Sequence, residues 1–459
     1  MEKSNQAHVI VIPYPSQGHI NPLLQFAKRL AAKGVRATLA TTVNTMQSIT
    51  SAAVAVEPIS DGFDDTDFAK AGKEGDYLSS IRDHGSKSLA RLLDGYRAAG
   101  SPVTCVIYDA FFPWALDVAL RHGAMGAAFF TNSAAVCAIF SHIRSGTLTL
   151  PVNVDDAPLV FPGLPPLNAC DVPTFLRNPN SYPAYLAMKL SQFSNLDEAD
   201  YVFANTFHQL ERQEAKSAEK NWPAKLVGPM VPSAYLDGRI EGDKGYGASL
   251  WKPLSEQCAA WLNTKPRESV IYISFGSMVS LTAKQTEEMA WAVKSSASYF
   301  LWVVRETERE KLPAGFTESV KGKGLIVSWC NQLEMLAHPA VGCFVTHCGW
   351  NSTLEGLALG VPMVALPQWS DQVTDAKFIE EIWGVGVRAK EDEFGVAGRE
   401  ELLYCLREVM EGESRVKMRS NARKWREMAI EATDEGGTSD TAINEFVMKL
   451  KVATTAVEI

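Results

Sequence analysis

The sequence predicts an α/β protein in which helices cover both faces of parallel β-sheets. Its first apolar run, Val9–Ile12, is uninterrupted, as expected of a strand buried on both faces of such a sheet. In the next segment, Leu23–Leu30, apolar residues recur at helical spacing, and a second strand-length segment begins at Val35–Thr41. Strand, helix and strand in this order form a β-α-β unit. We therefore expect a doubly wound parallel sheet in the first half of the chain.

Turn and cap residues predict the limits of the first helix. Pro13–Gly18 is rich in Pro, Gly and Ser and predicts a loop. Asn21 suits an N-cap and Pro22 the first helical position, while Gly34 suits the residue just past the end. We expect the helix to begin at Pro22, with Asn21 as its N-cap.

Length, charge and composition exclude several classes of protein. With 459 residues, the chain is long enough for two large domains or three of average size. It carries 53 acidic and 44 basic residues, a net charge of −9, and has no long basic run, so we expect no nucleic-acid partner. Because 46% of the residues are hydrophobic, a packed core is expected rather than disorder.

The chain carries no signal for a membrane or an oxidising compartment. No stretch approaches the roughly 18 apolar residues that span a bilayer, and Met1–His8 lacks the pattern of a signal peptide. Eight cysteines are too few for a disulfide scaffold in a chain of this length. We therefore expect a cytoplasmic protein with no integral membrane segment.

The strand and helix pattern stops and then restarts near the middle of the chain. Gly228–Leu250 is rich in Pro and Gly and predicts a linker. Beyond it, a helix is predicted at Leu281–Ser295. Strands are predicted at Ser269–Ser274, Tyr299–Val304, Gly324–Ser328, Val341–His347 and Met363–Leu366. The second half is therefore another α/β domain, and Gly436-Gly437 leads into a terminal helix.

His19 and Asp109 are the candidate catalytic residues of the first half. Each follows a predicted strand, Val9–Ile12 or Val103–Tyr108, and ligands of open parallel sheets bind beyond the carboxyl ends of the strands. A histidine is a suitable general base near neutral pH, and a carboxylate beside it can orient its ring. The alternative is that His19 only caps a helix and Asp109 only ends a strand.

A candidate phosphate site lies in the second half. Thr346–Thr353 follows a predicted strand and opens a helix, where free backbone N–H groups and hydroxyls favour an anion. Ser274–Ser277 is a similar turn that could contact the same phosphates. The alternative is an ordinary cluster of helix-capping residues.

Missing motifs narrow the chemistry. The chain has no Gly-x-Gly-x-x-Gly after its first strand, no P-loop and no Gly-x-Ser-x-Gly, which disfavours dehydrogenases, P-loop NTPases and α/β-hydrolases. Cys343, His347 and Cys348 lie along one strand and its turn, so we interpret the thiols as structural. Asp65-Thr66-Asp67 is interpreted as a solvated loop, and no metal site is expected.

The segment from Trp329 to Gln372 resembles the sugar-donor signature box of the plant family 1 UDP-sugar glycosyltransferases. The resemblance covers the whole chain and is closest to the branch that glucosylates small aromatic acids, terpenoids and xenobiotics. It rests further on Pro13–Pro22, Tyr108-Asp109, Asn205–Phe207, Gly228-Pro229 and Ser274–Ser277, which follow the order of the family's motifs.

This resemblance implies a GT-B fold, in which two Rossmann-like domains with parallel sheets face each other across a cleft. The first domain, residues 1–240 joined by the terminal helix 440–459, would bind the acceptor. The second, residues 241–439, would bind the UDP-sugar. The implied enzyme is a UDP-glycosyltransferase of plant secondary metabolism or detoxification.

The resemblance also assigns donor-binding residues. Trp329 would stack on uracil, Gln332 and Glu355 would hold the ribose, and Asp371 and Gln372 would bind the sugar hydroxyls, a terminal Gln being associated with UDP-glucose. The diphosphate would be held by Ser277, His347, Asn351, Ser352 and the backbone of Trp350. Gly18 and Cys330 complete the expected donor-binding set.

The implied reaction is a single inverting displacement in which His19 is the general base, assisted by Asp109, with UDP-glucose as co-substrate and neither metal nor other cofactor. Its acceptor would be a hydroxyl or carboxyl group of a small, hydrophobic molecule. We expect the acceptor pocket to include Phe111, Phe112, Phe130, Tyr185 and Trp369, and the protein to be a monomer. The alternatives are an inactive UDP-sugar sensor and another GT-B sugar-nucleotide enzyme.

Overall fold

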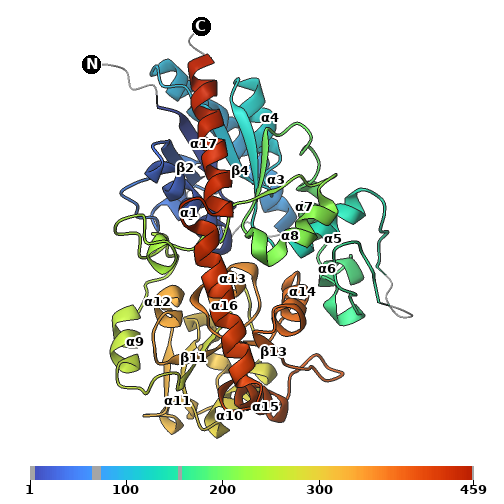
Figure 1. Ribbon diagram of the computed structural model, residues 1–459, viewed down its shortest axis with the longest axis vertical. Coiled ribbons are helices and arrows are strands. Elements are labelled where there is room, and N and C mark those ends of the chain that lie inside the picture. The colour runs from blue at the N-terminus through green and yellow to red at the C-terminus, as the bar shows by residue number, and fades with distance from the viewer. Residues whose placement is uncertain (1–5, 65–73, 153–157, 457–459) are drawn as a thin grey trace. The chain divides into compact units, whose positions relative to one another are not determined.

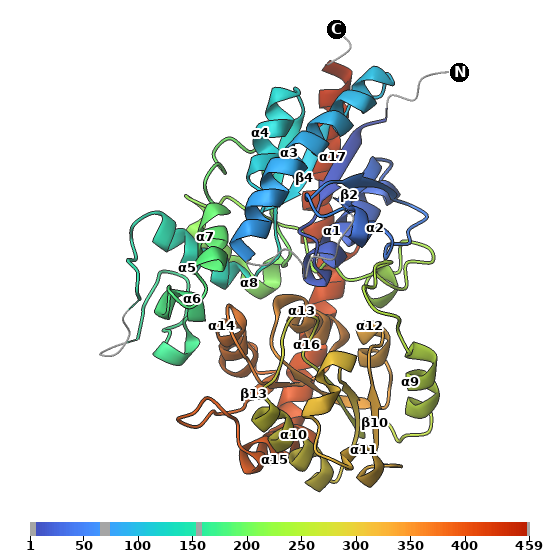
Figure 2. The same cartoon turned by 180° about the vertical axis from the view of Figure 1, so that it is seen from behind.

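The computed structural model describes residues 6–64, 74–152 and 158–456 (Figures 1 and 2). The chain forms two compact units. The first comprises Met1–Leu167, Phe175–Leu250 and Glu431–Ile459, and the second comprises Asn168–Thr174 and Trp251–Ile430. The junctions thus follow residues 250 and 430, whereas the expected domain limits were 240 and 439. A short segment from the middle of the first half also belongs to the second unit.

The first unit contains a seven-stranded sheet in the order β3-β2-β1-β4-β5-β6-β7, and every paired strand is parallel. The strand order reverses between β1 and β4, which places a crevice beyond the carboxyl ends of these two strands. The strands are β1 (His8–Ile12), β2 (Arg36–Thr42), β3 (Ala55–Ile59), β4 (Cys105–Asp109), β5 (Met125–Phe130), β6 (Tyr201–Ala204) and β7 (Lys225–Leu226).

Two helices distant in the sequence pack together in the core of this unit. The ring centroids of Phe26 of α1 and Phe446 of α17 lie 6.5 Å apart. Each ring also packs on the sheet, with centroid distances of 5.2 Å from Phe26 to Phe129 of β5 and 5.0 Å from Phe446 to Phe203 of β6. The terminal helix therefore contributes to the first unit. Its helices are α1 (Gln17–Ala32), α2 (Val43–Met46), α3 (Glu74–Ala98), α4 (Trp114–Arg121), α5 (Ala134–Arg144), α6 (Thr174–Arg177, which begins in the second unit), α7 (Pro183–Ser191), α8 (His208–Ala218) and α17 (Thr438–Ala456).

Helix α1 begins five residues earlier than the cap pattern predicts. Its first turn is closed by the Ile20 N–H, which donates to the Ser16 carbonyl at 2.9 Å, so Pro22 lies inside the helix. The expected start at Pro22, with Asn21 as the N-cap, is therefore wrong. Because the first turn forms before the proline, His19 belongs to a helix and not to a loop, and its backbone is fixed by helical hydrogen bonds.

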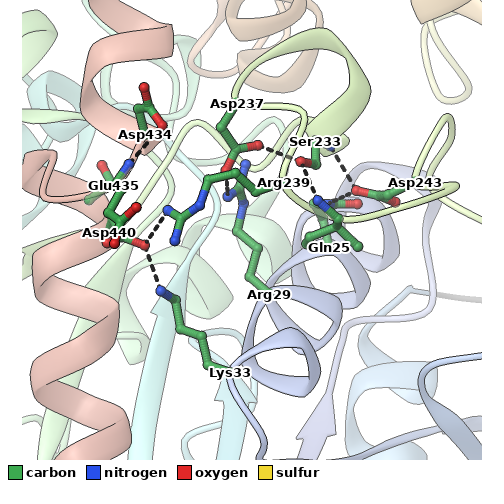
Figure 3. A network of polar contacts seen from close by, with 12 residues as sticks. Gln25, Arg29, Lys33, Ser233, Asp237, Arg239, Asp243, Asp434, Glu435 and Asp440 are labelled. Carbon is green, nitrogen blue, oxygen red and sulfur yellow. Dashed lines mark hydrogen bonds and ion pairs between the residues drawn. The ribbon is translucent and has the colours of Figure 1, made fainter.

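The segment Gly228–Leu250 is not a linker, because buried polar contacts attach it to α1 (Figure 3). Asp243 accepts from Gln25 Nε2 at 2.6 Å and from Lys28 Nζ at 3.0 Å. Asp237 pairs with Arg29 at 3.0 Å, and its other oxygen accepts from the Ser233 hydroxyl. All these groups are buried, and such charges require partners. The Pro and Gly content suggested a flexible connection, but the two aspartates attach the segment to the helix.

The terminal helix is tied to the same network. Asp440 of α17 pairs with Lys33, the C-cap residue of α1, at 2.5 Å and with Arg239 at 3.1 Å (Figure 3). Gln25 and Arg29 of α1 and its C-cap Lys33 are spaced four apart and so lie along one face of the helix. Polar contacts on this face join three parts of the chain that lie far apart in the sequence.

The second unit contains a six-stranded parallel sheet in the order β10-β9-β8-β11-β12-β13, which reverses between β8 and β11. Its strands are β8 (Val270–Ser274), β9 (Tyr299–Val303), β10 (Gly324–Val327), β11 (Val341–Thr346), β12 (Met363–Ala365) and β13 (Gly386–Arg388). Its helices are α9 (Ser255–Leu262), α10 (Ala283–Ser295), α11 (Phe316–Ser319), α12 (Gln332–Leu336), α13 (Trp350–Leu359), α14 (Gln372–Lys377), α15 (Arg399–Met410) and α16 (Arg415–Thr433), whose last turn lies in the first unit. The predicted α/β class, with parallel sheets and interleaved helices, is confirmed in both units.

Candidate active site

His19 and Asp109 meet at the point where the first sheet reverses its strand order. His19 lies in the first turn of α1, which follows β1, and Asp109 is the last residue of β4, which pairs with β1. His19 Nδ1 lies 2.6 Å from Asp109 Oδ2. The Asp109 side chain is 1% exposed and that of His19 is 16% exposed. The sequence placed both residues beyond strand ends, and the structure brings them into hydrogen-bond contact.

Backbone groups hold Asp109 in the orientation that it needs to contact His19. Its Oδ2 accepts from the Tyr14 N–H at 3.1 Å, and its Oδ1 accepts from the Phe111 N–H at 3.0 Å. Both oxygens of Asp109 therefore act as acceptors, and the tautomer of His19 that carries its proton on Nδ1 donates to Oδ2. In the part of the chain that the structure describes, His19 Nε2 has no hydrogen-bond partner. This nitrogen is therefore available to accept a proton.

Aromatic rings surround the imidazole of His19. The ring of Phe111 lies 4.7 Å from it and that of Tyr14 lies 5.4 Å from it, measured between centroids. Thr131 Oγ1 lies 3.2 Å from His19 Nδ1. Gly18 precedes His19 in the first turn of α1. His19 thus has its Nδ1 held by Asp109, its Nε2 available to a substrate, and the apolar rings of Tyr14 and Phe111 beside it.

The second group of predicted residues lies where the sheet of the second unit reverses. β11 ends at Thr346, and α13 begins at Trp350, so His347 lies in the turn between them. The N-terminus of α13, which includes Asn351 and Ser352, carries the positive end of the helix dipole and so favours an anion. The indole of Trp350 is buried against Trp383, at 6.1 Å. Trp350 can therefore offer a ligand its backbone more readily than its ring.

Two glycines make room for the imidazole of His347. A β-carbon at Gly349 would lie 2.4 Å from His347 Nε2, and one at Gly276 would lie 2.8 Å from its Cε1. Burial lowers the pKa of His347 from 6.5 to about 4, so the ring is neutral at pH 7. A neutral imidazole has one N–H to donate. His347 can therefore offer a phosphate a hydrogen bond without bringing a buried charge.

The two predicted ribose-binding residues contact each other directly. Gln332 Nε2 donates to Glu355 Oε2 at 2.7 Å and lies 2.9 Å from Ser352 Oγ. Tyr272 of β8 donates through its hydroxyl to Gln332 Oε1 at 3.4 Å. Glu355 is buried in α13, and Gln332 begins α12. These contacts converge on one group of polar atoms at the carboxyl edge of the sheet.

The predicted uracil-binding ring is supported by a second tryptophan. Trp329 is partly exposed, and its ring centroid lies 4.5 Å from that of Trp251 at an angle of 40°. The Trp329 carbonyl accepts from the Leu254 N–H at 2.9 Å, and the Asn331 N–H donates to the Ser255 hydroxyl at 3.0 Å. The start of α9 thus fixes the segment that contains Trp329 and the buried Cys330.

The predicted sugar-binding residues Asp371 and Gln372 lie in a firmly held turn. Gln372 Oε1 accepts from the Gln368 N–H at 3.0 Å and from the Trp369 N–H at 3.2 Å, so the Nε2 end of its amide faces away from these contacts. Ser370 has a φ of 61°, which is uncommon for a residue other than glycine. This strained conformation needs support from its surroundings.

The segment Asn168–Thr174 provides that support. Thr174 exchanges two hydrogen bonds with Ser370: its hydroxyl accepts from the Ser370 N–H at 2.8 Å, and its N–H donates to the Ser370 carbonyl at 3.1 Å. Asp171 pairs with Arg388 at 2.8 Å and with Lys377 at 3.2 Å, and the side chains of Asp171 and Lys377 are each 3% exposed. This segment thus fixes the turn that carries Asp371.

Arg305 also supports the site, and the motif analysis did not find it. Its guanidinium donates to the carbonyl of Ser277, and at 2.5 Å to that of Val279. It thereby fixes the turn that contains the predicted phosphate ligand Ser277. Arg305 follows β9 by two residues, so the rule that selected His19 and Asp109 could have selected it. It was missed because no short motif surrounds it.

The aromatic residues predicted to form an acceptor pocket occupy different surroundings. Phe111 contacts His19, while Phe112 is buried and packs 5.3 Å from Trp114. Phe130 is fully buried against Phe193 and Trp222, so the structure places it in the core and not on a pocket surface. Tyr185 lies in α7, where it stacks on Phe175 at 6.1 Å, and Trp369 packs on the core of the second unit.

Within residues 6–64, 74–152 and 158–456, no three His, Cys, Asp or Glu side chains form a group that could hold a metal ion. The cysteines are free thiols, and Cys343 and Cys348 are both buried. Asp65-Thr66-Asp67 lies outside the described residues. None of the helices that could be searched is both long and apolar enough to cross a membrane.

Comparison with known protein families finds two matches. Residues 209–428 match the family described as UDP-glucoronosyl and UDP-glucosyl transferase, and residues 5–60 match the family described as glycosyltransferase, N-terminal domain. The first match includes every predicted donor-binding residue except Gly18. The second includes Gly18 and His19.

Relatives are similar to the chain over nearly its full length. UDP-glycosyltransferase 74B1 of Arabidopsis thaliana is 50% identical over 97% of this chain and 98% of its own length. Flavonol 7-O-beta-glucosyltransferase UGT74F1 of the same plant is 46% identical over 98% of this chain and 100% of its own. The crystal structure of Os79 from O. sativa in complex with UDP superimposes with a TM-score of 0.92, at 40% identity over 96% of this chain and 100% of that one.

Proposed function

The chain belongs to the plant family 1 UDP-glycosyltransferases, and we propose that it transfers glucose from UDP-glucose to a small, largely apolar acceptor. Its parallel sheets and its similarity to solved glycosyltransferases confirm the expected GT-B fold. The observation that carries the proposal is the 2.6 Å contact between His19 and Asp109, which leaves His19 Nε2 available as a base. The reacting group of the acceptor is a hydroxyl or a carboxyl.

The second unit would bind the UDP-sugar through the residues described above. Trp329 offers a partly exposed ring for uracil, and Gln332 and Glu355 offer polar atoms for the ribose. The N-terminus of α13, the Ser277 hydroxyl and the neutral His347 would hold the diphosphate. Support for this assignment comes from Os79, a similar protein whose structure contains UDP.

The proposed reaction is one displacement at the anomeric carbon of glucose. His19 Nε2 accepts the proton of the acceptor hydroxyl as the acceptor oxygen bonds to this carbon. The bond from the carbon to the UDP oxygen breaks with its electron pair, and UDP leaves. Attack opposite the leaving group inverts the configuration. Asp109 stabilises the imidazolium and keeps Nε2 directed to the substrate.

The negative charge that develops on UDP needs stabilisation. Hydrogen-bond donors fixed by the fold can supply it, because they are already oriented when the charge appears. We assign this role to the α13 N-terminus, Ser277 and His347, and we propose that the reaction requires no metal. Activity should therefore persist after exhaustive treatment with EDTA. Loss of activity that Mg²⁺ or Mn²⁺ restores would contradict this part of the proposal.

The test is an acceptor screen with UDP-glucose, in which UDP release and product mass are both measured. A phenol or small acid should gain the mass of one hexose. His19→Ala should lower kcat by roughly 10²- to 10⁴-fold for a hydroxyl acceptor and leave UDP affinity within about twofold. UDP binding without transfer to any acceptor would instead support an inactive sensor. Conversion of UDP-glucose to a different sugar product in the absence of any acceptor would indicate another GT-B sugar-nucleotide enzyme.

A further inference from the structure

Lys189 is a buried cation whose position the proposed chemistry does not explain. It lies in α7, and the residue is 6% exposed. Its ammonium donates to Asn132 Oδ1 at 2.8 Å and lies 5.0 Å from the centroid of the Phe111 ring. Both contacts are with neutral groups, and neither neutralises the charge.

A buried ammonium normally pairs with a carboxylate, because an unpaired charge in an apolar environment is unfavourable. Among the residues whose placement the structure gives, no Asp or Glu forms an ion pair with Lys189. An ammonium has three N–H donors, and the contact with Asn132 uses one of them. Two donors therefore remain for a group that comes from outside the chain.

The surroundings of Lys189 connect it to the candidate base. The ring of Phe111 contacts both groups: its centroid lies 5.0 Å from Lys189 Nζ and 4.7 Å from the His19 ring. On the other side, Asn132 follows Thr131, whose hydroxyl lies 3.2 Å from His19 Nδ1. Tyr185 precedes Lys189 by one turn of α7 and lies on the same helical face.

We propose that Lys189 binds an anionic group, specifically a carboxylate, on the acceptor. This inference rests on the proposed function and extends it, because it makes a carboxylate on an otherwise apolar acceptor a determinant of specificity. The ring of Phe111 offers an apolar surface to the body of the acceptor, and Lys189 recognises its charge. A carboxylate would supply the partner that the ammonium lacks in the protein.

The test compares an acid and its neutral methyl ester, such as 4-hydroxybenzoate and methyl 4-hydroxybenzoate, and measures glucosylation of the phenolic hydroxyl in both. The ratio of their kcat/KM values, acid over ester, should favour the acid in the wild type. Lys189→Met should lower this ratio by about 10- to 100-fold, the range for losing a hydrogen bond to a charged group, and Lys189→Arg should retain most of it. The KM for UDP-glucose should not change. Lys449→Met, at an exposed position of α17, is the control for removal of one positive charge.

Three results would overturn the inference. The first is an unchanged kcat/KM for both acceptors in Lys189→Met. The second is an equal loss of activity on both acceptors, since that indicates a structural role. The third is a raised KM for UDP-glucose, since that places Lys189 at the donor. Retained activity on the ester shows that the variant is folded.

Calorimetric titration of the acid into protein saturated with UDP separates this inference from the proposed function, because binding needs no turnover. Weaker binding of the acid to Lys189→Met, with unchanged binding of the ester, supports the inference even if no glucoside forms. Glucosylation of neutral acceptors without any preference for acids leaves the proposed function intact and overturns the inference.

Discussion

The imidazole of His347 occupies the space that a side chain at Gly276 would need, since a β-carbon there would lie 2.8 Å from His347 Cε1. Gly276 belongs to the turn after β8 and His347 to the turn after β11, and these are the neighbouring strands at which the sheet reverses its order. The absence of a side chain at Gly276 thus determines where the predicted phosphate-binding histidine lies.

Gly276→Ala should weaken the binding of UDP-glucose more than it lowers the stability of the fold. The new methyl group would displace His347, so the KM for UDP-glucose should rise by about 10-fold, the effect of one lost charge-assisted hydrogen bond. Gly315→Ala is the matched control: Gly315 also has a positive φ, 71° against 68° at Gly276, but nothing lies within 4 Å of its β-carbon position. Equal effects of the two substitutions on KM would show that backbone strain, and not His347, is responsible.

Asp109→Asn should lower kcat by about 10²- to 10⁴-fold and leave UDP affinity nearly unchanged. The amide removes the charge that stabilises the imidazolium, and its NH₂ group can favour the wrong tautomer of His19. Steady-state kinetics and calorimetric binding of UDP measure the two effects. If kcat fell no further in the double variant with His19→Ala than in His19→Ala alone, the two residues would be acting as a unit. Full additivity would contradict the assigned roles.

His8 should contribute to a loss of stability in acid. Burial lowers its pKa from 6.5 to about 4, so the unfolded chain takes up its proton first as the pH falls. Stability from the neutral ring is present above pH 6.5 and decreases as the pH falls toward 4, by on the order of 3 kcal/mol for this group. Urea unfolding at pH 7 and pH 4.5 should therefore show a smaller difference for His8→Gln than for the wild type. An equal difference in both proteins would contradict this origin.

Asp171→Asn should destabilise the second unit, because it leaves the buried ammonium of Lys377 and the guanidinium of Arg388 without a full counter-charge. Breaking a buried pair in this way costs about 3–5 kcal/mol. The KM for UDP-glucose should also rise, because Asn168–Thr174 supports the turn before Asp371. The control is Asp83→Asn, since Asp83 and its partner Arg82 are each 60% exposed. That change should alter stability by less than about 1 kcal/mol, and similar losses from both variants would argue against the predicted role of Asp171.

Strand periodicity and strand-end chemistry predicted much of the fold and of the candidate site. The apolar run Val9–Ile12 becomes β1, and the position of Asp109 after a strand brings it to His19. These signals depend only on residues close together in the chain, so they can be recognised in a single sequence. Contacts between distant segments leave no such pattern. Only the structure shows that Asp171 pairs with Arg388 and that Lys189 donates to Asn132. Local signals can also mislead. Asn21 and Pro22 have the residue types of a helix start, but α1 begins at Gln17, so Pro22 lies inside the helix.

The pairing of Asp237 and Asp243 with α1 has a consequence for exchanging the two halves between related enzymes. A chimera joined between residues 228 and 237 would take both aspartates from the other parent, so their ion pairs with Arg29 and Lys28 would be lost unless that parent carries the same two aspartates. Joining after residues 250 and 430 keeps these partners together. The exchanged segment, residues 251–430, would still lack Asn168–Thr174 of its own unit. Its Arg388 would therefore need an aspartate at position 171 of the chain that receives it.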